Sequence, residues 1–196
     1  MKKSTIILIS VAAVIAVIIM WGVSGYNGLV TAQEEVNSQW SNVESQYQRR
    51  ADLIPNLVST VKGYATHESS TLEGVVAARA KATQISVNAE SLTPEKLQQY
   101  QAAQGQVSSA LGKLLMISEN YPDLKANQNF LELQAQLEGT ENRIAVERGR
   151  FNEMAKEYNL TIRRFPRSIL AGIFDFGKKP YFEAEKASAA APKVQF

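Results

Sequence analysis

The single histidine is the first residue of this sequence that could carry acid–base or metal chemistry. His67 is followed directly by Glu68, and the chain contains no cysteine. Thiolate nucleophiles, thiolate metal sites and disulfides are therefore excluded. One histidine beside one carboxylate is common in proteins of every function, so we expect no catalytic residue, no metal site and no cofactor. A hydrolase that combines carboxylates with His67 is the alternative.

Three charged residues stand where a helical pattern otherwise places apolar side chains. Arg50 interrupts one apolar stripe, and Glu141 and Arg148 interrupt another. Because a buried charge without a partner is costly, we predict that Glu141 pairs with Arg50, Arg148 or both. We interpret the three residues as a structural charge network that fixes the register of the helices. An anion or other ligand site, as in a sensor at the membrane, is the functional alternative.

Long helices must position these charged residues. Residues 29–64 and residues 130–158 each repeat apolar side chains with a seven-residue period. This spacing predicts two long helices that pack on partners with shallow crossing angles. Pro55 removes one hydrogen bond from the first helix, so a kink is expected near Asp52.

Two shorter helices are predicted between the long ones. The first follows residues 68–71 and carries its apolar residues on one side, namely Leu72, Val75, Val76 and Ala80. The second starts at the N-cap residue Thr93 and runs to about Glu119. A turn is expected at residues 120–123, and residues 169–176 are apolar enough to dock on the helices. The predicted fold is all-α, an elongated antiparallel bundle of three to four helices with long first and last helices.

An uncharged run of 19 residues, 5–23, precedes the predicted bundle. A helix that rises about 1.5 Å per residue would cross the roughly 30 Å hydrocarbon layer over this length. Lys2 and Lys3 predict that residues 1–4 are cytoplasmic and that the bundle domain, residues 26–182, faces outward. A secretory signal cleaved after Gly25 is the alternative. We interpret Gly22, Gly25 and Gly28 as a soft joint behind the anchor.

The charge balance bears on the partners of the domain. The chain has 21 basic and 19 acidic residues, so the part that follows Lys2 and Lys3 is neutral. A neutral domain has no overall attraction to phosphate backbones, and we expect no nucleic-acid partner. A minority interpretation places Arg163, Arg164 and Arg167 near anionic lipid. Residues 183–196 are expected to form a flexible tail.

Several separate motifs, in a fixed order, resemble signatures of the LemA family. They lie at residues 26–30, 48–58, 64–68, 121–127, 141–144 and 158–159, and include Arg49, Arg50, Asp52, Leu53, Ile54, Pro55, Asn56, His67, Glu68, Tyr121, Pro122, Asp123 and Leu124. The resemblance covers about residues 1–182, and it departs from the family pattern at Phe151-Asn152, where a Tyr-Asn pair is frequent. It implies a membrane-anchored, extracytoplasmic helical bundle.

The expected function is therefore that of a scaffold or adaptor in the cell envelope. The bilayer would hold residues 5–23, and a second envelope protein or another copy of the chain would be the partner. A long apolar stripe permits self-association as well as partner binding.

Overall fold

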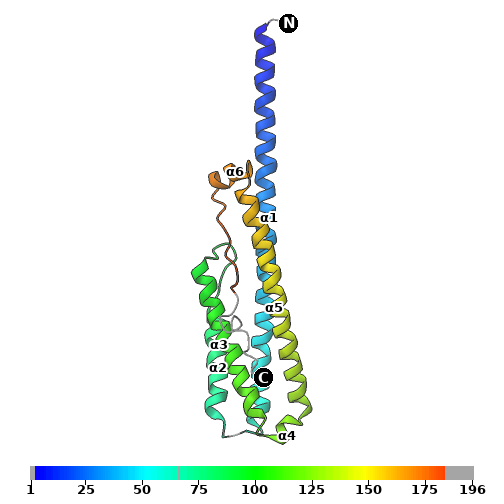
Figure 1. Ribbon diagram of the computed structural model, residues 1–196, viewed down its shortest axis with the longest axis vertical. Coiled ribbons are helices and arrows are strands. Elements are labelled where there is room, and N and C mark those ends of the chain that lie inside the picture. Colours follow the sequence, from blue (N-terminus) through cyan, green and yellow to red (C-terminus); the bar gives the residue numbers. More distant parts are fainter. Residues whose placement is uncertain (1–2, 66, 184–196) are drawn as a thin grey trace, which may run out of the picture.

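The computed structural model describes residues 3–65 and 67–183, and this part of the chain is helical without any strand (Figure 1). The all-α prediction is confirmed. The helices are α1 (Lys3–Lys62), α2 (Ser69–Gln84), α3 (Pro94–Ser118), α4 (Pro122–Lys125), α5 (Gln128–Arg163) and α6 (Arg167–Ile173).

Helix α1 is the axis of the molecule. Its N-terminal third projects alone, and the rest packs against α5, which runs antiparallel to it (Figure 1). The hairpin of α2 and α3 covers the part of α1 that lies farther from the N-terminus. By length and composition, α1 is the one helix of the described chain that could cross a membrane.

The heptad positions of the sequence form the core. Leu29, Val36, Val43 and Leu57 of α1 are fully or nearly fully buried, as are Phe130, Leu137, Ile144, Phe151 and Tyr158 of α5. These residues form two apolar clusters along the bundle. One cluster is rich in aromatic residues and lies nearer the projecting end, and the other is mainly aliphatic and lies nearer α4. Burial of their apolar surface stabilises the bundle.

The structure refines two local expectations. Helix α1 continues without interruption through Gly22, Gly25 and Gly28, so these residues are not a break in the helix. A Cβ atom on Gly25 would lie only 2.5 Å from Leu170 Cδ1, which means that Gly25 allows α6 to approach α1 closely. In α2 the buried residues are Leu72, Val75 and Ala82, whereas Val76 and Ala80 are exposed.

The segments that connect or follow the predicted helices contain two short helices that were not expected. The turn predicted at residues 120–123 leads into the single turn of α4, whose first residue is Pro122. The apolar segment 169–176 contains most of α6, which packs on α1 and α5. The N-cap at Thr93 is present, since its side chain accepts a hydrogen bond from the amide of Lys96. The predicted tail lies outside the described residues except for Glu183.

Candidate functional site

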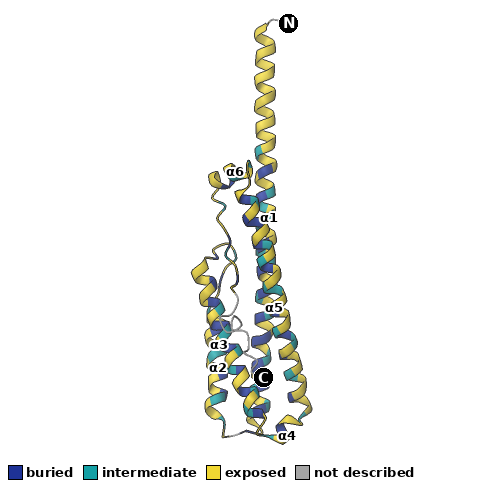
Figure 2. Ribbon diagram, in the orientation of Figure 1, coloured by how far each residue is buried: buried dark blue, intermediate teal, exposed yellow. Residues whose placement is uncertain are grey.

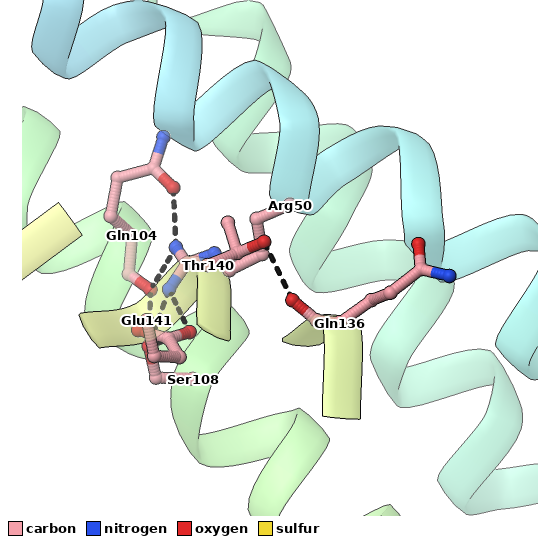
Figure 3. A network of polar contacts seen from close by, with 6 residues as sticks. All are labelled: Arg50, Gln104, Ser108, Gln136, Thr140 and Glu141. Atoms are coloured by element: carbon pink, nitrogen blue, oxygen red, sulfur yellow. Dashed lines mark hydrogen bonds and ion pairs between the residues drawn. The ribbon is translucent and has the colours of Figure 1, made fainter. Parts of the chain in front are cut away.

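Arg50 lies at the centre of a polar network that joins three helices (Figure 3). Its Nη1 donates to Glu141 Oε1 at 2.6 Å and to Ser108 Oγ at 2.7 Å. Its Nη2 donates to the side-chain and main-chain oxygens of Gln104, at 2.6 and 3.0 Å. The Arg50 side chain is only 2% exposed, and that of Glu141 is 40% exposed. Arg50 therefore ties α1 to α3 and α5, and both of its terminal nitrogens are engaged within the protein.

Arg148 lies two turns beyond Glu141 on α5 and contacts a different part of the chain. Its Nη2 donates to the carbonyl oxygen of Glu183 at 3.1 Å, and its guanidinium stacks 4.9 Å from the centre of the Phe182 ring. The structure thus brings Arg50 and Glu141 together, and it extends their network through Gln104 and Ser108 while Arg148 binds the C-terminal segment.

Two asparagines of α5 hold this C-terminal segment by its backbone. The Asn159 side chain accepts from the amide of Lys179 and donates to its carbonyl oxygen, at 2.9 and 2.8 Å. Asn152 likewise accepts from the amide of Phe182 at 2.8 Å and donates to its carbonyl oxygen at 3.0 Å. Sequence reasoning missed this role. The signal was the repeat of an aromatic residue followed by asparagine, seven residues apart at 151–152 and 158–159.

A groove of about 840 Å³ opens beside Arg50, between α1, α2 and α3. Its lining includes every residue from Gln48 to Ile54, the first part of the 48–58 motif region. Within it, Gln48 Nε2 donates to Asp52 Oδ1 at 2.7 Å. Pro55 and Asn56 of the same motif are exposed. The motif therefore contributes both to the core and to one wall of the groove.

Arg79 of α2 explains how α1 accommodates Pro55. A proline at position 55 has no amide hydrogen to donate to the carbonyl of Ala51, one turn earlier. The Nε of Arg79 donates to that carbonyl oxygen at 2.7 Å. Because a buried carbonyl without a donor is destabilising, Arg79 compensates for the proline and joins α2 to α1.

The groove has polar groups with altered acidity. Burial raises the pKa of the Tyr100 hydroxyl well above its ordinary value of 10.0, and the charges of Tyr47 and Glu44 act in the same direction. Burial also raises the pKa of Glu44, although a hydrogen bond with Trp40 opposes the shift. A neutral Tyr100 fits its position in the aromatic cluster, where its ring lies 5.4 Å from those of Trp40 and Tyr47.

The motifs at residues 64–68 and 121–127 meet at the end of the bundle remote from the projecting helix. Tyr121 Oη donates to Glu68 Oε1 at 3.1 Å, and Asn127 Nδ2 donates to Tyr64 Oη at 2.9 Å. Leu124 is fully buried beneath them, while Asp123 is exposed. These motif residues close the end of the bundle.

His67 is exposed at the same end, beyond the last residue of α1, and it does not line the groove. Within residues 3–65 and 67–183, no three His, Asp or Glu side chains are placed to hold a metal ion. The groove beside Arg50, by contrast, has both polar and apolar residues in its lining.

Comparison with known proteins agrees with the motifs. Residues 39–196 match the LemA family. Magnetosome protein MamQ 2 of Paramagnetospirillum magneticum is 31% identical over 205 residues, which cover 95% of this chain and 73% of that protein. Magnetosome protein MamQ of Magnetospirillum gryphiswaldense is 30% identical, over 86% of this chain and 68% of the relative. Protein LemA of Metamycoplasma hominis is 26% identical, over 82% and 69%. The family match covers most of the bundle, including the groove and the Arg50 network, and the chain belongs to the LemA family.

Proposed function

We propose that this chain is a membrane-anchored scaffold or adaptor of the cell envelope that has no catalytic activity. Its N-terminus lies in the cytoplasm and its bundle outside, in accordance with Lys2 and Lys3 before the apolar segment. The apolar part of α1 and the similarity to LemA and MamQ proteins support a location at a membrane.

The observation that carries this proposal is the continuity of α1. One helix contains both the apolar segment and the axis of the bundle, with no linker between them. At about 1.5 Å per residue, the helix from residue 23 to residue 62 rises about 60 Å. The groove, at residues 41–54 of α1, then lies roughly 25 to 45 Å beyond the apolar segment. A site held at a set height suits a protein that presents or positions a partner.

The groove is the candidate partner site. Gln48, Arg49 and Asp52 are exposed along one wall, and Leu53 and Ile85 are half-buried. A mixture of exposed polar groups and partly covered apolar side chains is typical of transient protein interfaces. The partner is either another envelope protein or a second copy of the chain.

Two alternatives find less support. A sensor that captures an anion would need a guanidinium free to bind it, and the terminal nitrogens of Arg50 are engaged by Glu141, Gln104 and Ser108. A hydrolase that used His67 would work at the far end of the bundle, where the motif residues form a structural closure.

Photo-crosslinking in native membranes tests the proposal. A photoreactive amino acid at Gln48, on the groove wall, is compared with the same amino acid at Gln128. The two positions are matched, since each glutamine side chain donates to an acidic residue four positions later on an exposed helix face. We expect a discrete adduct from position 48 and none from position 128, and its mass separates a second copy from another envelope protein. Equal labelling at both positions, or none at position 48, would contradict a partner site in the groove.

A further inference from the structure

Figure 2 shows that α6, at the end of the bundle from which α1 projects alone, has many exposed residues, and several of these are large and apolar. The α5–α6 connection and α6 contribute Phe165, Ile169, Ile173 and Phe174, which are 82%, 49%, 67% and 53% exposed. We refer to these four residues as the α6 patch. Large apolar side chains grouped in this way on a surface indicate a contact with a membrane or another protein.

The position of α6 along α1 is fixed by close contacts. Leu170 packs on Gly25, and the ring of Tyr26 lies 4.8 Å from that of Phe174 and 5.8 Å from that of Phe176. Gly25 follows the last residue of the apolar segment by two positions, a rise of about 3 Å along the helix. When residues 5–23 lie in the hydrocarbon layer, α6 therefore lies at the level of the lipid headgroups.

The orientation of α6 is also fixed. Leu170 and Ala171 are buried, which leaves Ile169 and Ile173 on the face turned away from the bundle core. The helix ends at Ile173, the φ of 55° at Asp175 reverses the chain, and the amide of Phe176 donates to the carbonyl of Ala171 at 2.9 Å. This C-terminal capping motif returns the chain to Tyr26 and fixes the position of Phe174 within the patch.

Basic residues flank the patch along the chain. Arg163, Arg164, Arg167 and Lys178 are all exposed, and Asp175 is the acidic residue among them. Apolar side chains flanked by arginine and lysine at headgroup depth match the surface of a bilayer that contains anionic phospholipid. A protein partner would not require this patch to coincide with the end of the apolar segment.

We propose that the α6 patch is a second membrane contact of this chain. Its apolar side chains enter the interface of the leaflet from which α1 emerges, and its basic residues pair with the phosphates of anionic lipids. This inference rests on the proposed anchoring by α1. A single membrane helix leaves a domain free to rotate about the helix axis. A second contact fixes this rotation, and it therefore also fixes the direction, parallel to the membrane plane, in which the groove opens.

Site-directed fluorescence on the full chain tests this contact. Because the chain has no cysteine, single cysteines introduced as Ile173→Cys, Val14→Cys and Met116→Cys can each carry an environment-sensitive fluorophore. Position 14 reports the anchor, and position 116, exposed on α3, reports the surface of the bundle away from the membrane. Each labelled protein is reconstituted into vesicles of phosphatidylcholine and phosphatidylglycerol, and quenching by aqueous iodide is compared with quenching by spin-labelled lipid.

The inference predicts that positions 14 and 173 are quenched by the spin-labelled lipid and that iodide quenches them several-fold less than position 116. If position 14 is protected from iodide while position 173 is quenched as strongly as position 116, the proposal of a second contact is wrong, and the anchoring by α1 is still supported. If position 14 is also open to iodide, the anchoring fails and the inference fails with it.

A charge variant tests the lipid phosphates separately. Arg163→Gln, Arg164→Gln and Arg167→Gln together should increase iodide quenching at position 173 in vesicles with phosphatidylglycerol. The matched control replaces three exposed basic residues of the bundle, Lys81, Lys113 and Arg143, by glutamine. Equal quenching in the two triple variants would overturn the pairing of the arginines with anionic lipid.

Discussion

At the scale of residues, the charged positions on the apolar stripes are the most informative feature of this protein. Arg50 lies between the two apolar clusters of the core and is held by Glu141, Gln104 and Ser108. The charge of Glu141 is only half-buried, so water shares in its solvation. The main effect of the ion pair is therefore to give the buried guanidinium of Arg50 a charged hydrogen-bond acceptor. The bonds of Arg50 in turn align α1, α3 and α5.

Replacement of Glu141 by alanine should destabilise the bundle. Arg50 would lose its charged acceptor while it remains 2% exposed, and a buried charged group deprived of one partner typically costs about 1–3 kcal/mol. The melting temperature of the full chain in detergent, followed by circular dichroism, measures the effect. Glu153→Ala, at an exposed position of the same helix, is the control. Equal melting temperatures would show that the pair does not fix the packing of the helices.

Tyr100 should make the free energy of unfolding depend on pH in the alkaline range. Its raised pKa keeps the hydroxyl protonated in the folded chain above pH 10, where a tyrosine in the unfolded chain ionises. The folded state then binds more protons, so the free energy of unfolding falls as the pH rises, by up to about 1.4 kcal/mol per pH unit for one such group.

Tyr100→Phe should therefore reduce the loss of stability above pH 10. Unfolding by urea at a series of alkaline pH values compares the slopes of the two proteins, and other ionising groups contribute equally to both. Parallel slopes would mean that the burial of the Tyr100 hydroxyl does not control its ionisation.

At the scale of elements, the two long helices were predictable because their apolar positions recur every seven residues. The start of α3 was predictable from Thr93 and Pro94. The same pattern gave the prediction that Glu141 pairs with Arg50, Arg148 or both, since a charge on a buried stripe requires a partner, and in the structure Glu141 binds Arg50. Local pattern could not predict the contact of Gly25 with Leu170 or the hold of Asn159 on Lys179. Both depend on where an irregular C-terminal segment returns to the bundle, and such a segment has no periodicity to reveal its partner.

The hydrogen bond from Arg79 to the Ala51 carbonyl predicts an interaction between two substitutions. Arg79→Ala leaves the carbonyl without its donor and should cost about 1–2 kcal/mol. Pro55→Ala provides an amide that can donate to the same carbonyl, so the loss of Arg79 should cost much less in that background.

A double-mutant cycle of the four proteins, measured by unfolding in urea, tests this compensation. We expect a coupling free energy larger than about 0.5 kcal/mol, the size found for residues that share a partner. Additive effects would mean that Arg79 stabilises the bundle by some other contact.

At the scale of the whole molecule, one helix joins the apolar segment to an elongated bundle. The order in which α2, α3 and α5 pack on α1 was not predictable, because all of them carry compatible apolar stripes and only the turns between them select the arrangement. Its consequence is that the groove and the α6 patch have fixed heights along one axis. The groove lies on the part of the bundle that is remote from the apolar segment, and the α6 patch lies where α1 leaves that segment.

The orientation of the chain in the membrane is the most direct test of an envelope scaffold. Single cysteines introduced as Ser4→Cys and Met116→Cys, which leave Lys2 and Lys3 in place, are treated in intact cells with a maleimide that cannot cross the membrane, and again after permeabilisation. We expect position 116 to react in intact cells and position 4 to react only after permeabilisation. Reaction at position 116 only after permeabilisation would put the bundle in the cytoplasm and contradict the proposed role in the envelope.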